Sequence, residues 1–467
     1  MNRSTASASR ASNRLLVGDD VSSVRNDVCI LTATGEVLLN HQPFVNDLAG
    51  YVALRDTVLE VFQRAEAAGV DFAGEATGWY WFHTFYALAH DEELNGLDLH
   101  LSLFNPRLTH AFKKAMASRD QADPKDARGV AERTRFARAE HPPVLDDTWL
   151  GRRLLTRHYY HLSHALAAEK TYFSACLFLK ASAYRQLKLF TDVFGVTSSA
   201  LITQYSTLQE LADLPLAELE GLLKTLSHHH LPDVEEKAQR LHAVAVQSFP
   251  VPPHMLDPLN FVLRATLEHI RFLEQQLAET EAAIERAFAN VPELGWLMSI
   301  PGMGLILAAC LLAELCPFDR FFDGTVMDRK TGRPRAKNAR DAEASIAKWV
   351  GLWWPRNQSG TFEGEITRMP KDGNRYARYA LIQLANCLRE HSAEFAGYYA
   401  RKHAESKTHA HKRALVLSAR KAIGLIVALL HTGQLYRTPE PYRDVLSPHQ
   451  ARGQAAASSA AATDPCS

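Results

Sequence analysis

The 467-residue chain lacks the patterns by which several protein classes are recognised. Its six cysteines form no C-x-x-C pair and no zinc-finger spacing, which argues against structural zinc and predicts reduced, inert thiols. It has no excess of positive charge either, because 52 Lys and Arg balance 52 Asp and Glu. A protein that coats nucleic acid by bulk charge is therefore disfavoured, and basic residues would have to act locally.

The sequence also has no internal repeat and no clean hydrophobic run of membrane-spanning length. The most apolar window, residues 296–315, contains Pro301-Gly302-Met303-Gly304 and an acidic Glu314, which favours two buried helices broken by a turn. Residues 1–13 are rich in Ser, Ala and Arg without an apolar core, as in a disordered tail and unlike a secretory signal. We expect a cytoplasmic protein with no membrane partner.

Hydrophobic periodicity predicts an α/β region followed by all-α regions. Five apolar runs predict strands and one longer periodic stretch predicts a helix. The strands are expected at residues 15–17, 28–31, 35–39, 70–73 and 97–103, and the helix at residues 46–68. Three strands, then helix, strand, helix, strand and helix is the order of a ribonuclease-H-like fold.

The middle of the chain, residues 149–290, is almost wholly helical by pattern. Half of a coiled-coil seam repeats every seven residues, and two charges interrupt the other half. The apolar half is Leu263, Ile270, Leu277 and Ile284, and the other half is Leu267, Glu274, Glu281 and Phe288. An intramolecular helical hairpin and a coiled coil that joins subunits fit this pattern equally well.

The third region, residues 291–437, is also mostly helical by pattern and carries a basic insertion. The insertion consists of Arg329, Lys330, Arg333, Arg335, Lys337 and Arg340. It could contact RNA or DNA, or form a solvated loop. The Ala- and Ser-rich end, residues 454–467, cannot bury a core and is expected to be disordered.

Four acidic residues lie where a sheet and a helix could bring carboxylates together. Asp20 follows the first strand run, Glu75 follows the fourth, and Asp123 and Asp126 are three residues apart at an expected helix start. Because adjacent strand residues face opposite ways, only one of Asp19 and Asp20 can point into a site, and we choose Asp20. Taken singly, each acid is explained as well by a turn, a helix cap or a first-turn acid. Together they offer enough oxygen ligands for one or two Mg²⁺ or Mn²⁺ ions, which predicts phosphoryl transfer on nucleic acid.

Weaker signals suggest phosphate contacts in the third region. The turn with Gly302 and Gly304 resembles a helix-hairpin-helix turn, whose backbone N–H groups can cradle a phosphate, although a simple turn fits as well. Further candidates for contacts to nucleic acid are Arg356, Asn374, Arg375 and Arg378, for which an ordinary solvated surface is the alternative.

In combination these segments resemble the bridge-RNA-guided insertion-sequence transposases, or DEDD-type serine recombinases, over roughly residues 15–435. The matching segments, in chain order, are Gly18-Asp19-Asp20-Val21-Ser22, Gly74-Glu75-Ala76-Thr77-Gly78-Trp79-Tyr80-Trp81, Asn105-Pro106, Asp123-Pro124-Lys125-Asp126-Ala127, Ser299-Ile300-Pro301-Gly302-Met303-Gly304, and Gly351-Leu352 through Gln358-Ser359-Gly360 to Gly373-Asn374. Departures are Asp19, where the family usually has an apolar residue, and Gln121-Ala122, which replaces a common Lys-Thr.

The resemblance implies a domain order and roles for single residues. It divides the chain into a disordered tail at 1–14, a RuvC-like domain at 15–148, a helical or coiled-coil region at 149–290, a transposase domain at 291–437 and a disordered tail at 438–467. It makes Asp20, Glu75, Asp123 and Asp126 the metal-binding tetrad and Ser359 the nucleophile. It implies double-stranded donor and target DNA, a structured guide RNA, and a homodimer or homotetramer as partners.

Two other functions compete with this one. A RuvC-like junction resolvase or nuclease would use the same tetrad to activate water, with Ser359 only structural. A non-enzymatic nucleic-acid-binding protein would have kept the fold and lost catalysis, which the presence of all four acids disfavours.

Overall fold

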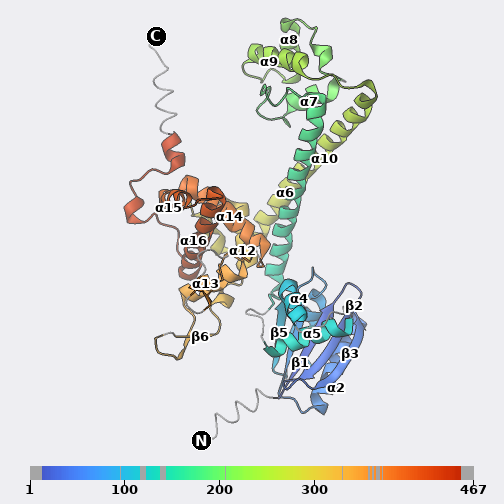
Figure 1. The fold of residues 1–467 in the computed structure, drawn as a ribbon, viewed down its shortest axis with the longest axis vertical. Helices are drawn as coiled ribbons and strands as arrows, with labels where there is room; N and C mark the ends of the chain where they lie inside the picture. Colours follow the sequence, from blue (N-terminus) through green and yellow to red (C-terminus); the bar gives the residue numbers. More distant parts are fainter. Residues whose placement is uncertain are drawn as a thin grey trace. The chain divides into compact units, whose positions relative to one another are not determined.

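The computed structural model describes residues 13–453 apart from 95, 116–122, 137–142, 206, 329, 356–357, 360–361, 364–368 and 371, and leaves out the side chains of 108, 115, 123–125, 358–359 and 362–363 (Figure 1). Contacts divide the chain into two compact units. One is Leu154–Asn290, and the other joins the residues up to Arg153 with those from Val291 onward. Of the tails expected at 1–14 and 438–467, residues 1–12 and 454–467 lie outside the described residues, whereas β1 begins at Arg14 and the short helix η3 covers Glu440–Tyr442.

A five-stranded sheet with the order β3-β2-β1-β4-β5 forms the N-terminal part of the first unit. The strands β1, β2 and β3 are antiparallel neighbours, and β4 and β5 add to β1 in parallel. Their bounds are β1 Arg14–Val21, β2 Arg25–Thr32, β3 Val37–Val45, β4 Gly69–Glu75 and β5 Leu99–Phe104. This mixed sheet followed by mostly helical regions confirms the predicted ribonuclease-H-like fold with all-α parts.

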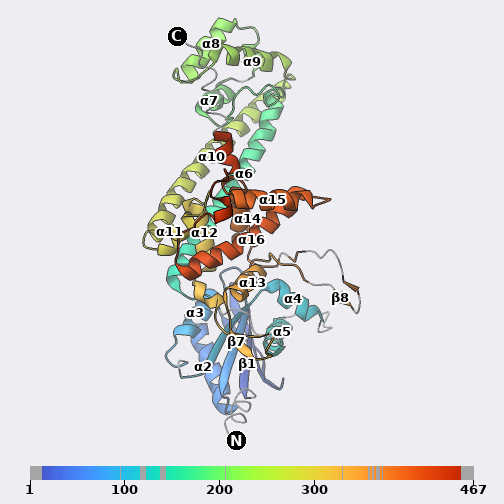
Figure 2. The same cartoon turned by 90° about the vertical axis from the view of Figure 1, so that its left-hand side faces the viewer.

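Helices cover both faces of this sheet (Figure 2). They are α2 Leu48–Arg64, α3 Phe82–His90, α4 Pro106–Ala115 and α5 Asp123–Phe136. The α2 helix begins where the Asp47 side chain accepts a hydrogen bond of 2.7 Å from the Gly50 nitrogen, which satisfies one of the free first-turn N–H groups. Leu15 and Val17 point into the larger core with α2 and α3, whereas Leu16 packs against α5. This two-residue alternation along β1 sets which side chains can meet α5.

The second unit is a helical hairpin with a small helical end (Figure 1). Its elements are α6 Asp147–Lys180, of which residues 147–153 belong to the first unit, α7 Val196–Gln204, η1 Gln209–Leu211, α8 Leu216–Leu226, α9 Val234–Gln247 and α10 Pro253–Phe288. Leu263 and Ile270 of α10 share one core with Phe173 and Leu177 of α6. An ion pair of 2.6 Å between Lys170 and Glu274 also joins the two helices. The predicted coiled-coil seam therefore packs against another helix of the same chain. Glu274, one of the two charges that interrupt the seam, is paired with Lys170.

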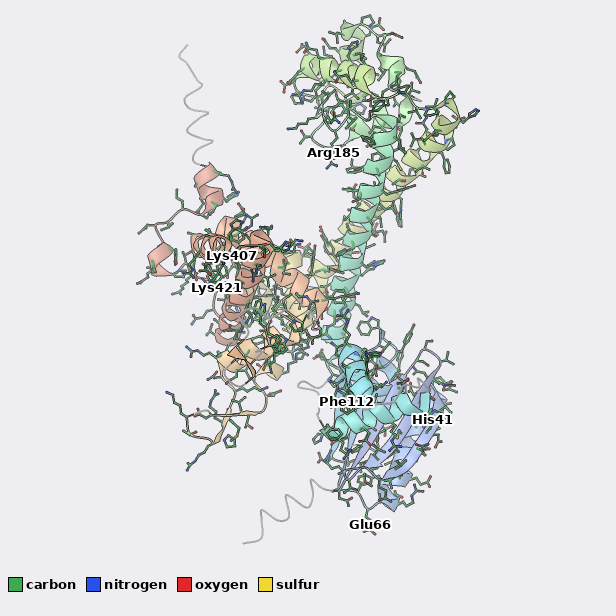
Figure 3. The ribbon with its side chains drawn as sticks, viewed as in Figure 1. His41, Glu66, Phe112, Arg185, Lys407 and Lys421 are labelled. Atoms are coloured by element: carbon green, nitrogen blue, oxygen red, sulfur yellow. The ribbon has the colours of Figure 1, made fainter. Side chains whose placement is uncertain are left out.

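The C-terminal part of the first unit is mostly helical. Its elements are α11 Pro292–Met298, α12 Leu305–Leu315, η2 Phe318–Phe321, β6 Thr325–Met327, β7 Pro334–Ala336, α13 Ala339–Trp349, β8 Gln358–Ser359, β9 Phe362–Glu363, α14 Arg375–His391, α15 Ala393–Ala404, α16 Ala410–Thr432 and η3 Glu440–Tyr442. Helix α16 packs against α13, α14 and α15. Lys421 of α16, which is labelled in Figure 3, forms an ion pair of 2.6 Å with Glu394 of α15 and lies over the ring of Phe395.

Among the described residues, α16 is the one helix long and apolar enough to cross a bilayer. Half of its apolar window is buried inside the protein. A helix in the core of a protein that is surrounded by water can have the same length and composition, so this helix is weak evidence for a membrane segment.

Candidate active site

Asp20 lies on the α5 face of the sheet, near the end of β1. Gly18, two residues earlier, is so close to α5 that a Cβ there would collide with the backbone of Ala127 and Ala131. Since strand side chains alternate, Asp20 shares this face. Asp19 points the other way and is fully buried, and neither of its carboxylate oxygens has a hydrogen-bond partner among the described residues.

Glu75 lies beside Asp20 at the end of the neighbouring parallel strand. Asp19 pairs with Gly74 in the β1–β4 register, which sets Asp20 and Glu75 side by side. A Cβ on Gly74 would meet the ring of Phe85 in α3, so Glu75, one residue on, faces α5. Two carboxylates from two strands therefore reach the same face.

Asp126 adds a third carboxylate from the first turn of α5. The Lys113 ammonium, on α4, lies 2.9 Å from Glu75 Oε1 and 2.9 Å from Asp126 Oδ1. Helix α5 begins at Asp123, as the sequence predicts, while the side chain of Asp123 is outside the described residues. The structure thus brings Asp20, Glu75 and Asp126 together around one lysine.

The electrostatics of this cluster are those of partly buried like charges. Burial raises the pKa of Asp20 from 3.8 to about 6, Lys113 opposes the rise, and Glu75 and Asp126 add to it. Burial also disfavours the charge on Lys113, but its hydrogen bonds to Glu75 and Asp126 outweigh this and raise the pKa of the ammonium. Burial raises the pKa of Asp19 well above its usual value, and the nearby charges of Asp20 and Asp27 add to this, so its surroundings favour the protonated form.

Sequence reasoning missed Lys113. It precedes Lys114 on a short amphipathic helix, and such a pair is typical of a solvated surface. The one available signal is Gly129, which lies inside α5 where glycine is unfavourable. A Cβ at Gly129 would lie 2.8 Å from Cγ of Lys113, so the glycine leaves room for the lysine stem.

The other predicted site residues lie in the C-terminal part. Gly302 has φ +80°, and a Cβ there would meet His391 and Cys387 of α14, while Gly304 is the N-cap of α12. Ser359 is in β8 with its side chain outside the described residues, and Arg356 lies wholly outside them. The structure therefore describes no contact between Ser359 and the carboxylates.

Asn374 has a structural place that its sequence context could have revealed. Its side-chain oxygen accepts hydrogen bonds from the nitrogens of Tyr376 and Ala377 at the start of α14, which is the common role of Asn before a helix. Its Nδ2 donates to the buried Glu314 Oε2 at 2.7 Å. Both ends of the amide are thus engaged inside the protein.

The two arginines that follow Asn374 differ. Arg378 donates to the carbonyl oxygen of Val350 at 2.8 Å. Arg375 is exposed and lies over the ring of Tyr376. Arg375 is therefore the more accessible of these two candidates for a phosphate contact.

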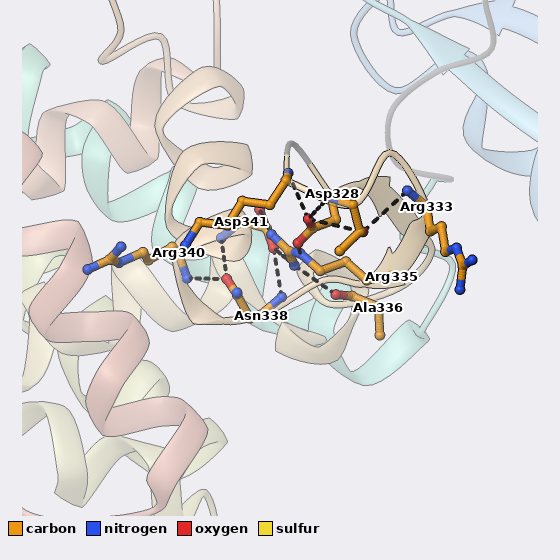
Figure 4. Close-up of polar contacts among 9 residues, drawn as sticks. Asp328, Arg333, Arg335, Ala336, Asn338, Arg340 and Asp341 are labelled. Atoms are coloured by element: carbon orange, nitrogen blue, oxygen red, sulfur yellow. Dashed lines mark hydrogen bonds and ion pairs between the residues drawn. The ribbon is translucent and has the colours of Figure 1, made fainter.

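The basic insertion forms a two-stranded hairpin, β6–β7, which leads into α13. Arg335 lies inside it, with ion pairs of 2.6 Å to Asp341 and 3.4 Å to Asp328 (Figure 4). Arg333 and Arg340 point away from this cluster and are exposed (Figure 4). The sequence predicted the basic run but not the strands, which are only three residues each.

The sequence matches two transposase domain families. A DEDD-type transposase domain of the IS110 group matches residues 17–179, and a domain described as "Transposase IS116/IS110/IS902 family" matches residues 334–400. The chain carries IS110-family transposase domains. A search of curated proteins found no match. The DEDD domain contains all four candidate acids, and the second domain contains Ser359, Asn374, Arg375 and Arg378.

The transposase domains indicate an enzyme that binds, cleaves and rejoins DNA, and the DEDD type indicates dependence on a divalent metal ion. The residues of the DEDD domain fit such an ion by their chemistry, because carboxylate oxygens on one face are the ligands of hard cations. Among the described residues, no three acidic, histidine or cysteine side chains are close enough to hold an ion as they stand. Lys113 instead supplies the positive charge between Glu75 and Asp126.

Proposed function

We propose that this chain is the transposase of an insertion sequence, in which a metal-binding tetrad and a serine nucleophile cut and rejoin DNA. The tetrad is Asp20, Glu75, Asp123 and Asp126, and the nucleophile is Ser359. The observation that carries the proposal is the meeting of Asp20, Glu75 and Asp126 on the α5 face of a ribonuclease-H-like sheet.

The carboxylates would hold Mg²⁺ or Mn²⁺. When bound, such an ion stabilises the negative charge that develops on the phosphate and orients the reacting oxygens. Asp20 and Glu75 come from adjacent strands, so the sheet holds their backbones fixed, and Asp126 approaches from α5. This rigidity favours a defined geometry for the bound phosphodiester.

Ser359 would attack the scissile phosphorus. The Oγ–P bond forms as the bond from phosphorus to one sugar oxygen breaks, and the hydroxyl proton of Ser359 passes through a base to the leaving sugar oxygen. The phosphoserine linkage keeps the bond energy of the phosphodiester. Attack by a sugar hydroxyl from a second DNA end then releases Ser359 and completes the rejoining.

A structured guide RNA would select donor and target DNA by base pairing, while the protein contacts backbone and shape. The balanced overall charge favours local contacts of this kind. Exposed basic residues on the β6–β7 hairpin and Arg375 supply such contacts. A homodimer or homotetramer would hold the two DNA partners.

The proposal is tested with purified protein, its copurifying RNA, and duplex DNA bearing the element ends. Strand cleavage is expected with Mg²⁺ or Mn²⁺, and none is expected with EDTA or with Glu75→Gln. Cleavage that persists at the wild-type rate in Glu75→Gln would remove the tetrad from the mechanism. Sequencing the copurified RNA tests the guide, because an RNA without complementarity to either DNA would contradict it.

A further inference from the structure

We propose that Lys113 is a resident counter-ion that couples metal loading of the site to the binding of nucleic acid. This rests on the proposed function of the carboxylates. Without a metal ion, the Lys113 ammonium holds Glu75 and Asp126 together, and it leaves them for a phosphate oxygen of bound DNA when a metal ion enters.

The first observation is the double contact of the ammonium. It lies 2.9 Å from one oxygen of Glu75 and 2.9 Å from one of Asp126, within the range of charge-assisted hydrogen bonds. These are oxygens that a metal ion would need. Lys113 and a divalent ion therefore compete for the same ligands.

The second observation is that the aliphatic part of the Lys113 side chain packs closely against Gly129. Gly129 lies against the stem, and any larger residue there would crowd it. Glycine is unfavourable inside a helix relative to alanine, so its presence in α5 calls for a packing reason. The stem is thus held over the sheet while only its tip has freedom to change partners.

The third observation is the charge balance around the tip. Asp20 lies close enough to Glu75, Asp126 and Lys113 for each to affect its charge, so three acids surround one ammonium. The positive charge of Arg133 in α5 also interacts with Glu75. Its guanidinium, however, donates a hydrogen bond to the Thr109 hydroxyl and lies over the ring of Phe104. Lys113 is therefore the cation that directly bridges the acids among the described residues.

Displacement of Lys113 leaves a partly buried ammonium beside a divalent ion. A desolvated charge without a partner is unfavourable, and a like charge nearby adds to the cost. A DNA phosphate removes both penalties. Metal ion and DNA should therefore bind cooperatively, and by linkage each raises the affinity for the other by the same factor.

The experiment measures Mn²⁺ binding to the full chain by calorimetry, with and without a duplex whose scissile phosphate is replaced by a non-cleavable analogue. In wild type we expect DNA to raise Mn²⁺ affinity by roughly tenfold or more, within the usual range of such couplings. In Lys113→Met, we expect tight Mn²⁺ binding without DNA and little further gain with it. The matched control is Lys114→Met, which alters the exposed neighbour and should behave as wild type.

A second variant guards against misfolding. Lys113→Arg keeps the charge and should retain the coupling, whereas metal-free Lys113→Met should melt at a lower temperature and recover with Mn²⁺. Equal or weaker Mn²⁺ affinity in folded Lys113→Met would overturn this inference alone. Absence of Mn²⁺ binding in wild type, with and without DNA, would instead overturn the proposed metal site.

Discussion

Asp19 and Asp20 are neighbours in β1 whose side chains point to opposite faces of one sheet. Asp20 faces α5 with Glu75 and Asp126, while Asp19 is buried on the face covered by α2 and α3. The sequence alone leaves the choice between them to the alternation rule and the resemblance. The structure gives this choice a physical basis. Only a residue without a side chain fits where Gly18 meets α5, so Gly18 and therefore Asp20, two residues on, face α5.

Replacing these two acids separates their roles. Asp20→Asn should abolish DNA cleavage, because it removes a charged ligand of the proposed metal ion. Asp19→Asn should keep most activity, since Asp19 points away from the other acids, and its burial raises its pKa and so disfavours the charge that the substitution removes. Cleavage assays at saturating Mg²⁺, with circular dichroism to check folding, test this. An inactive but folded Asp19→Asn with an active Asp20→Asn would reverse the assignment.

Asp20 should also make stability depend on pH. Its pKa is raised from 3.8 to about 6, so the folded protein binds the extra proton within that window and its free energy of unfolding falls as pH rises through it. Above pH 6 the Asp20 carboxylate is ionised in the folded protein, and the unfavourable free energy of burying this charge then lowers stability in full. Asp20→Asn should therefore be more stable than wild type by roughly 1–2 kcal/mol at pH 7, a value discounted for partial exposure. Urea unfolding in EDTA at several pH values tests this, and a difference that does not shrink below pH 4 would contradict it.

Gly18 is expected to tolerate no side chain. Gly18→Ala should lower stability by about 1–3 kcal/mol or more, because the added methyl group must push α5 from the sheet. It should also reduce cleavage, since Asp126 moves with α5. Gly151→Ala in α6 is the control, because nothing lies within 4 Å of a Cβ there. Thermal melts of both variants decide the point, and equal melting temperatures would show that α5 can shift freely.

The basic residues of the β6–β7 hairpin and of the start of α13 should fall into two kinds. Lys330→Gln, Arg333→Gln or Arg340→Gln should each weaken nucleic-acid binding and lower the salt dependence by about one ion per lost phosphate contact. Arg335→Gln should instead loosen the hairpin, because Arg335 pairs with Asp328 and Asp341. Binding is measured over a salt series with the wild-type chain alongside. If a variant that combines these three Gln substitutions left the salt dependence of binding unchanged, the hairpin and the start of α13 would be excluded as a binding surface.

Ser359 is expected to become covalently joined to a DNA end. A suicide substrate with the cognate RNA should trap an adduct on a denaturing gel with wild type and none with Ser359→Ala. Ser345→Ala, the nearest preceding serine, serves as the control. An adduct or normal cleavage in Ser359→Ala would transfer the role to water or another residue and favour a junction resolvase.

The sequence predicts the sheet well because its signal is local. Strand alternation and the acids at strand ends depend on residues close in the chain, so β1, β4, Asp20 and Glu75 are predictable. Lys113 is not, since its role depends on how α4 packs against α5 and β4. Asn374 differs again, because its position before α14 is typical of a helix cap, and the structure shows its amide in that cap and in a hydrogen bond to Glu314.

The packing of α5 also bears on how the protein is made. In the folded protein, Ala127 and Ala131 of α5 pack against an apolar strip of the sheet made of Leu16, Cys29 and Leu31. During synthesis, these two alanines leave the ribosome about a hundred residues after the strip. At usual synthesis rates of about 5–20 residues per second, this apolar strip stays uncovered for roughly 5–20 seconds. The nascent sheet therefore passes through an interval in which chaperones can bind the face that later holds Asp20 and Glu75.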